Sequence, residues 1–404
     1  MTNLPLKGVR IVDIAHAWAG PHATRILADF GAEVIRVEYI KRLCLLRGGK
    51  KENQAYNNQP SWFQINRNKY SITLDLNIER DRSILKDLVK ISDVFIENAR
   101  AGVMDKLGFS YQDLIRIRPD IIAVSMAGFG NSGPYASFAG YGATFEAMSG
   151  IQNLTAYDKK TKPYRIKEMD IINGIVAAGA IMTALLYRQR TGEGQHVDFS
   201  HMEASSHALM GEHLLEYVMN GTQTVPIGNR HPRFAPQGCY PCQGSDKWVT
   251  LTVRSDKEWQ RFCDALCHHE WKTDKRFARL SARIKNHDEL DRLIGEWTAK
   301  YTHYEVMQIL QSYNIPSCAV LDVTEISSNP HLKEHTYFIS GVESSDKLFM
   351  GMPFTLSKGA GKIQWRGPDL GQHNERILCE LLGRSKDEVK PIKENEIGTA
   401  YDAE

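Results

Sequence analysis

The sequence lacks the features of exported and membrane-spanning proteins. Its opening, "MTNLPLKGVRIVDIAHAWAGP", has no basic segment followed by an apolar one, so we expect no signal peptide. No window reaches about 18 uninterrupted apolar residues. The most apolar stretch, 171–186, is interrupted by Asn173, Gly174, Gly179 and Thr183. We therefore expect a cytoplasmic protein that does not cross a membrane.

The chain also lacks a strong charge of either sign. Its 50 lysine and arginine residues against 48 aspartate and glutamate residues leave a net charge of +2. This balance does not indicate nucleic-acid binding, although a local basic pocket for phosphates remains possible. The 404 residues exceed one ordinary compact core and suggest about two domains.

The chain has few cysteines, and their number is odd. Seven cysteines, without an export signal, fit reduced thiols in a cytoplasm. "CYPC" (239–242) and "CDALCHH" (263–269) raise zinc binding as an alternative. The spacing within each pair is loose and a predicted strand separates them. Buried or incidental thiols are the favoured interpretation, and we predict no metal site.

Standard catalytic and nucleotide-binding motifs are missing. "AWAGPHAT" links a predicted strand to a helix start, where free N–H groups favour anions. It matches neither GxGxxG nor GxxxxGK[ST]. The sequence also has no GxSxG motif, so a serine nucleophile of that type is not expected.

The sequence does contain a repeated strand–helix–strand pattern. "VRIVDIA" (9–15) and "EVIRVEY" (33–39) read as strands, and "GPHATRILADFGA" (20–32) between them has helical spacing. The pattern recurs to about residue 130. It indicates an α/β fold with an open parallel sheet.

Composition changes after about residue 220, where a connection rich in Gly, Pro and Asn begins. We expect a large domain over 1–224 and a smaller α+β domain over 225–325. The C-terminal segment, 326–404, again mixes a strand and a helix, and we expect it to return to the large domain.

Basic and polar residues follow several predicted strands. The loops at the carboxyl ends of strands line the ligand crevice of a doubly wound sheet. Three such segments could together hold a polyphosphate, and a solvated basic rim is the alternative. The segments carry Arg36, Lys41, Arg42 and Arg47, then Arg67 and Lys69, then Asn98, Arg100 and Lys106.

A single carboxylate precedes the most apolar part of the chain. In "KEMDIINGIVAAGAIMTALLYRQRTGEGQ" (167–195), Asp170 stands directly before the apolar run. Aspartate is a favoured N-cap, and "DIIN" is typical of a helix start. The same position would keep a nucleophilic carboxylate ionised, because helix N–H groups and the helix dipole favour negative charge. The residues alone leave both interpretations of Asp170 open.

Several segments in this order resemble the class III CoA-transferase family, the CaiB/BaiF type. The quoted matches are "LKGVRIVDIAHAWAGP", "DFGAEVIRVE", "NRNKYSITLDL", "VFIENARAGVMDKLGF", "PDIIAVSMAGFGNSGPYA", "MDIINGIVAAGAIMTALLYRQRTGEGQHVDFSHMEA", "GNRHPRFAPQGCY" and "GPDLGQHNERIL". The resemblance covers nearly the whole chain.

The resemblance implies roles for individual residues. Asp170 falls on the family's catalytic aspartate. The expected CoA contacts are His16, Ala17, Arg42, Lys69, Asn98, Arg100 and Lys106. Trp18 and Gly142 depart from many members, which carry a polar residue and an acid at these places, so the acyl pocket is expected to differ.

The resemblance also implies a fold and a mechanism. The fold is a Rossmann-like large domain built from both chain ends, in an interlocked homodimer or a hetero-oligomer with a homologous subunit. No tightly bound cofactor is expected; CoA thioesters and carboxylic acids are substrates. Asp170 would carry CoA as an aspartyl thioester, and ATP would not be required.

Three segments are similar to the succinyl-CoA:benzylsuccinate branch of anaerobic aromatic degradation: "WAGP", "VEYIKRLCLLRGGK" and "RIKEMD". Succinyl-CoA is then the expected donor. Arg47 or Arg165 would pair with the second carboxylate of a dicarboxylic acid. An acyl-CoA racemase of the same fold and a non-catalytic CoA-binding subunit remain as alternatives.

Overall fold

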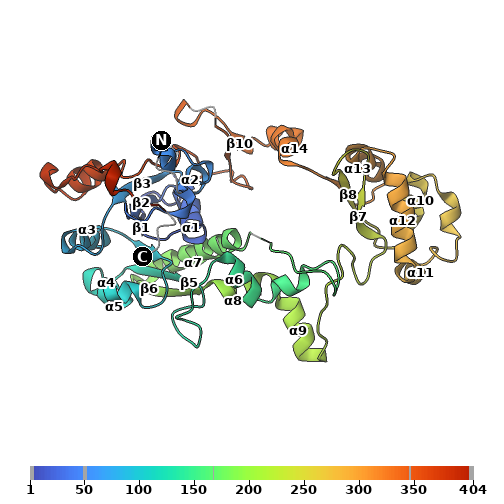
Figure 1. Ribbon diagram of the computed structural model, residues 1–404, viewed down its shortest axis with the longest axis horizontal. Coiled ribbons are helices and arrows are strands. Elements are labelled where there is room, and N and C mark those ends of the chain that lie inside the picture. The colour runs from blue at the N-terminus through green and yellow to red at the C-terminus, as the bar shows by residue number, and fades with distance from the viewer. Residues whose placement is uncertain (1–3, 49–51, 167, 345–346, 400–404) are drawn as a thin grey trace. The chain divides into compact units, whose positions relative to one another are not determined.

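The computed structural model describes residues 4–48, 52–166, 168–344 and 347–399, and the chain forms two compact units (Figure 1). The larger unit contains the chain up to Gln152, Arg165–Gln223 and the chain from Thr336 onward. The smaller unit contains Asn153–Tyr164 and Thr224–His335. Both ends of the chain therefore belong to the larger unit.

A parallel sheet forms the centre of the larger unit. In the described part of the chain it has six strands in the order β3-β2-β1-β4-β5-β6, and every pair is parallel. This is the order of doubly wound nucleotide-binding folds, in which ligands bind where the chain direction reverses, between β1 and β4. The predicted α/β fold is confirmed. The strands are β1 (Arg10–Asp13), β2 (Glu33–Glu38), β3 (Lys69–Thr73), β4 (Val94–Glu97), β5 (Ile122–Ala127) and β6 (Gln195–Ser200).

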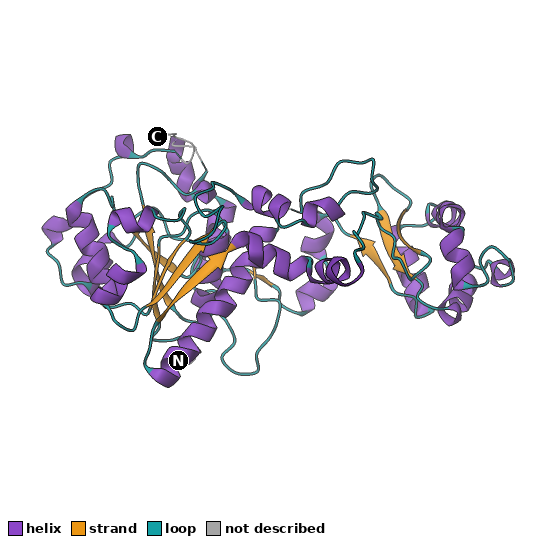
Figure 2. Cartoon of the chain, turned by 90° about the horizontal axis from the view of Figure 1, so that it is seen from below, coloured by secondary structure: helices purple, strands orange, loops and turns teal. Residues whose placement is uncertain are grey.

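Helices cover the sheet (Figure 2), and alternating strand residues build a core on each of its faces. Ile11 of β1 packs in a cluster with α1 (Ala19–Asp29) and α7 (Met169–Thr191). The next residue, Val12, packs on the opposite face against a second set of helices. Successive strand side chains point to opposite faces, so a continuous apolar strand such as "RIVD" needs cover on both. The covering helices of the second face are α3 (Glu79–Lys90), α5 (Tyr111–Ile117) and the short C-terminal helix η6 (Arg376–Leu381).

The helices α1 and α7 lie side by side on their face of the sheet (Figure 1). Gly174 of α7 allows this approach, because a Cβ there would lie 2.7 Å from the carbonyl oxygen of Ala19. The helix α7 is long and apolar enough to cross a membrane. Its contacts with α1, α8 (His201–Leu209), β5 and β6 instead make it a covering helix of the sheet.

The remaining elements connect this framework. In the larger unit they are α2 (Pro60–Ile65), α4 (Val103–Leu107), α6 (Gly142–Met148), α9 (Gly211–Asn220), β10 (Phe338–Ile339) and β11 (Phe349–Met350). The smaller unit has an antiparallel sheet of β7 (Gln237–Pro241), β8 (Trp248–Thr252) and β9 (Ser317–Val320) around its own apolar core. Its helices are α10 (Asp256–Ala265), α11 (Leu280–Lys285), α12 (His287–Thr298), α13 (His303–Ser312), α14 (Val323–Ser328) and α15 (Pro330–Glu334).

Candidate active site

Asp170 lies in the first turn of α7 rather than at its cap. The N-cap is Glu168, and its side chain makes no capping hydrogen bond. The expectation that Asp170 caps the helix is therefore wrong by two positions, because the helix begins at Met169. Asp170 is half-buried, and its carboxylate accepts no hydrogen bond from any described residue. A carboxylate in this state is a free acceptor beside the unpaired N–H groups of a helix start.

Two charged side chains set the electrostatics of Asp170. Burial raises the pKa of its carboxyl, the positive charge of Arg165 lowers it, and the negative charge of Glu146 raises it. The net direction is upward, so Asp170 is held less ionised than a solvated aspartate. The carboxylate form is correspondingly more basic and more nucleophilic.

Gly142 forms the wall that faces Asp170. It is the first residue of α6, and a Cβ at this position would lie 2.8 Å from Asp170 Oδ2 and 3.0 Å from Oδ1. An acidic side chain there would contact the carboxylate directly. Glycine at 142 therefore allows α6 to lie directly against Asp170.

The loop between β1 and α1 brings three of the predicted residues together. Asn98, at the end of β4, accepts from the His16 N–H and donates to the His16 carbonyl, both at 2.7 Å. Ala17 has φ of 59°, a left-handed conformation that costs free energy in a residue with a side chain. The N–H groups of Ala17 and Trp18 have no hydrogen-bond partner among the described residues. They are available for an anion or an oxyanion.

A buried ionic cluster around Asp13 holds this loop in place. Asp13 accepts from Lys69 at 3.0 Å, from Arg36 at 2.8 Å and from the Thr24 hydroxyl at 2.6 Å. Burial opposes ionisation of Asp13, but Lys69 and Arg36 prevail and lower its pKa to about 2. Its other partner is the Ala15 N–H, at 3.0 Å, inside the loop itself.

His16 is neutral at neutral pH. The residue is exposed at the surface, yet its imidazole lies among enough protein atoms to be desolvated. This desolvation, together with the positive charges of Arg36 and Arg42, lowers the pKa of His16 to about 4. A neutral imidazole can donate or accept a hydrogen bond, but it carries no charge to bind a phosphate.

The other predicted contacts divide into exposed and buried groups. Arg42, Arg100 and Lys106 are exposed, and they follow the carboxyl ends of β2 and β4, on either side of β1. Lys69 is fully buried, and it donates to Asp13, to the Pro21 carbonyl at 2.8 Å and to Asn66 at 3.0 Å. All three of its ammonium hydrogens are engaged inside the protein, so its position favours holding the loop over contacting a ligand.

Of the two arginines considered for a second carboxylate, Arg47 is unavailable. Its guanidinium is buried, binds both oxygens of Glu38 at 2.6 and 2.8 Å, and stacks on Trp62. The expectation for Arg47 is therefore wrong, because this arginine is a structural link between β2 and the chain after it. Arg165 is half-exposed and lies near Asp170.

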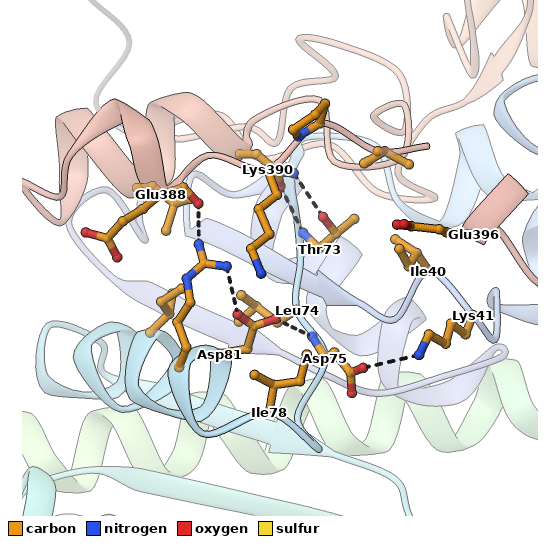
Figure 3. Close-up of a pocket in the computed structure, with 16 residues that line it drawn as sticks. Ile40, Lys41, Thr73, Leu74, Asp75, Ile78, Asp81, Glu388, Lys390 and Glu396 are labelled. Carbon is orange, nitrogen blue, oxygen red and sulfur yellow. Dashed lines mark hydrogen bonds and ion pairs between the residues drawn. The ribbon is translucent and has the colours of Figure 1, made fainter. Parts of the chain in front are cut away.

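A cavity of about 250 Å³ opens beside the ends of β2 and β3 (Figure 3). Apolar residues Ile40, Leu74 and Ile78 form part of its wall. Lys41 pairs loosely with Asp75 at 3.9 Å, and Lys390, from the C-terminal tail, points into the cavity. Its position could not be read from the sequence, because the tail is about three hundred residues away from the strands that it joins.

A second, larger cavity of about 900 Å³ lies along α1 and α7. Its lining is mostly apolar, from Ile171, Ile175 and Met182 of α7 to Phe354 of the C-terminal segment. Among the described residues, no group of three or more His, Cys, Asp or Glu side chains is arranged to hold a metal ion.

Comparisons with known proteins identify relatives along the whole chain. The model of "CoA-transferase family III" matches residues 6–374. The chain is 34% identical over 395 residues to succinyl-CoA–D-citramalate CoA-transferase of Chloroflexus aurantiacus, covering 96% of this chain and 97% of that protein. It is 28% identical over 403 residues to the succinyl-CoA–L-malate CoA-transferase beta subunit of the same organism, covering 98% of each.

A solved structure agrees with this result. A CaiB/BaiF family protein from Brucella suis superposes with a TM-score of 0.85 at 31% sequence identity, covering 94% of this chain and 100% of that one.

Proposed function

The chain belongs to CoA-transferase family III, and we propose that it transfers CoA from succinyl-CoA to a second carboxylic acid through a thioester on Asp170. One observation carries the assignment of the nucleophile. Asp170 presents a half-buried carboxylate that accepts no hydrogen bond from the described residues and is faced by a glycine. Its helix packs beside the start of α1, next to the loop with the free N–H groups of Ala17 and Trp18.

The proposed substrates are dicarboxylic acids and their CoA thioesters. The names of the two relatives contain succinyl-CoA, citramalate and malate, and the acid of each carries two carboxylates. Benzylsuccinate is also a dicarboxylic acid and remains the acceptor proposed from the sequence. Citramalate, malate and benzylsuccinate are therefore the acceptors to test.

The reaction needs only carboxylate and thiolate steps. An Asp170 oxygen attacks the thioester carbonyl of succinyl-CoA, the C–S bond breaks, and CoA thiolate leaves a mixed anhydride. The thiolate then attacks the Asp170 carbonyl carbon, and succinate departs with the anhydride oxygen. The acceptor carboxylate attacks the aspartyl thioester, and the released thiolate attacks the new acyl carbon, which frees Asp170. No net proton, electron or ATP is used, because each step exchanges one acyl bond for another.

Backbone donors would stabilise the intermediates. Each step passes through a tetrahedral oxyanion, and a preorganised N–H donor aimed at such an oxygen accelerates acyl transfer. We assign this role to the free N–H groups of Ala17 and Trp18. Asn98 holds the adjacent His16 peptide through two hydrogen bonds, so it positions these donors.

CoA would bind along the carboxyl ends of the strands. Arg42, Arg100 and Lys106 offer exposed positive charge on both sides of the loop that carries His16 and Ala17. The cavity lined by Lys41 and Lys390 would take the nucleotide end of CoA, with the adenine against Ile40 and Leu74. Lys69 contributes by fixing Asp13 under the loop.

The test is an activity assay of the purified chain with succinyl-CoA as donor and citramalate, malate or benzylsuccinate as acceptor. Asp170→Asn should abolish CoA transfer to every acid, because the amide cannot form the anhydride, while circular dichroism shows an unchanged fold. Transfer by Asp170→Asn at the wild-type rate would contradict the proposal. Solvent label entering the α-carbon without transfer would indicate a racemase, and CoA binding without either activity would indicate a non-catalytic subunit.

A further inference from the structure

We propose that Arg165 binds the remote carboxylate of dicarboxylic acyl groups, and that Glu146 holds Arg165 in position beside Asp170. The assignment rests on the proposed function and names the group that would select its substrate class. It makes Arg165 a specificity residue and Glu146 a positioning residue.

Glu146 is held firmly in place by the residues around it. Its side chain is completely buried on α6, and its carboxylate accepts from the Ile166 N–H and from Gln152, both at 3.2 Å. Its other oxygen lies 3.6 Å from Arg165 Nε. Glu146 therefore fixes both the backbone next to Arg165 and one edge of its guanidinium.

The rest of the Arg165 guanidinium is free. The side chain is 44% exposed, and it makes no hydrogen bond to any described residue. A guanidinium presents five N–H donors, and its terminal pair matches the two oxygens of a carboxylate. With Nε turned to Glu146, these terminal donors remain available for a ligand.

The neighbouring arginines contrast with Arg165. Arg47 is fully engaged by Glu38. Arg67 is buried and binds Asp29 at 2.7 Å. Both lie in the interior, whereas Arg165 stands half in solvent, close enough to Asp170 for its charge to lower the pKa of that carboxyl. An arginine with free donors near the nucleophile can reach the acyl group that the nucleophile attacks.

Gly142 brings α6 close to the nucleophile. A Cβ at this position would lie within 3.0 Å of the Asp170 carboxylate, so only glycine lets α6 lie directly against it. Gly142 and Glu146 are on the same short helix, one turn apart. The helix α6 thus contacts Asp170 through one residue and fixes the cation with the other.

The predicted effect is selective. Because Arg165 can pair with a substrate carboxylate only when that carboxylate is present, its loss penalises that substrate and spares an analogue without the group. Succinyl-CoA and butyryl-CoA have acyl chains of equal length, and only the first ends in a carboxylate. In a double-displacement reaction, kcat/KM for the donor reports the first half-reaction alone, so the acceptor does not obscure the comparison.

The experiment measures donor kcat/KM for wild-type protein, Arg165→Gln, Arg165→Lys and the remote control Arg116→Gln, an exposed arginine of α5. The assays are run at pH 8, because loss of Arg165 also raises the pKa of Asp170. Arg165→Gln should lower kcat/KM at least tenfold for succinyl-CoA and leave butyryl-CoA within twofold. Arg165→Lys should recover part of the loss, and Arg116→Gln should match wild type.

Any other result contradicts the assignment of Arg165. An equal fall for both donors would make Arg165 a structural residue and overturn the assignment, as would no change for either. If wild-type protein uses both donors but prefers butyryl-CoA, the assignment fails while the proposed transfer stands. If wild-type protein uses neither donor, the proposed function fails, and this assignment fails with it.

Discussion

Asp170 combines the properties that a carboxylate nucleophile needs. The first turn of α7 offers a field that favours its ionised form, whereas partial burial and Glu146 disfavour that form. Burial is the largest influence on the pKa of this carboxyl, and the net shift is upward. The result is a carboxylate that is more basic than a solvated aspartate and that accepts no hydrogen bond from the described residues.

Changing Glu146 should move the pH dependence of transfer. Glu146→Gln removes a negative charge near Asp170, so the pKa of Asp170 should fall and the acidic limb of the kcat/KM profile should shift to lower pH. Only the ionised carboxylate attacks, and a lower pKa keeps it ionised in more acidic solution. The measurement is kcat/KM for butyryl-CoA from pH 4 to pH 8.

Arg165→Gln should shift the pH dependence of kcat/KM in the opposite direction. It removes a positive charge from the same carboxyl, so the acidic limb should shift to higher pH. Glu79→Gln, which alters an exposed ion pair on α3, should leave the limb where it is in wild type. If the acidic limb of the kcat/KM profile lies at the same pH in wild type and all three variants, a group other than Asp170 controls the profile.

The loop between β1 and α1 depends on the elements beneath it. Its conformation includes a left-handed Ala17, which persists only where the surroundings hold it. Asn98 on β4 binds the His16 peptide, and Asp13 on β1 binds the Ala15 N–H. Asp13 is in turn fixed by Arg36 of β2 and Lys69 of β3. Four adjacent strands thus contribute to one loop.

Asp13→Asn should destabilise the larger unit by about 3–5 kcal/mol, because two buried cations would lose their counter-charge. Chemical denaturation at pH 7 measures the change, and the exposed control Glu79→Gln should unfold close to wild type. The pKa of Asp13 falls on folding from 3.8 to about 2, so its contribution is present above pH 4 and is lost as the pH falls toward 2. Unchanged unfolding at pH 7 would refute the supporting role of this cluster.

The sequence predicts the elements better than their polar contacts. Runs such as "EVIRVE" are apolar and β-branched enough to identify β2, and the strand–helix alternation predicts the parallel sheet. The run "SITLDL" (71–76) predicts the third strand, yet β3 spans Lys69–Thr73. It begins earlier because Lys69, a residue atypical of a buried strand, finds Asp13 as its partner.

The residues of the candidate site are harder to predict from the sequence than the strands, because their roles depend on which side chains are buried. A basic residue does not reveal whether it faces solvent, so Arg47 and Lys69 looked equivalent to Arg42 and Arg165. The partnership of Glu146 with Arg165 depends on how the segment before α7 folds back on α6. No local pattern encodes that contact, because it depends on tertiary packing.

The whole molecule presents apolar surface that a single chain leaves open. On α7, Ile175 is 54% exposed and Met182 is 42% exposed, and both line the cavity of about 900 Å³. Apolar patches of this extent mark interaction sites in proteins. We propose that a second copy of the chain covers this surface, in the interlocked dimer expected from the family. A homologous subunit is the alternative partner.

Met182→Asp should weaken this assembly, because an unpaired carboxylate would be buried at the interface. Light scattering after size exclusion should give the mass of a dimer for wild type and of a monomer for the variant. The control is Ile284→Asp, an exposed apolar residue on α11 of the smaller unit, which should remain dimeric. A wild-type monomer, or a dimer that survives Met182→Asp, would contradict the proposed interface.

Trapping the acyl-enzyme is the most direct measurement of the central claim, that Asp170 carries the transferred group. Wild-type protein is incubated with succinyl-CoA and hydroxylamine, which attacks an activated aspartyl carbonyl and leaves a hydroxamate, and the digested peptides are weighed by mass spectrometry. The account predicts a hydroxamate mass on the peptide containing Asp170, dependent on succinyl-CoA and absent from Asp170→Asn. CoA transfer in the same sample with no modification at Asp170, or with the modification on another carboxylate, would contradict it.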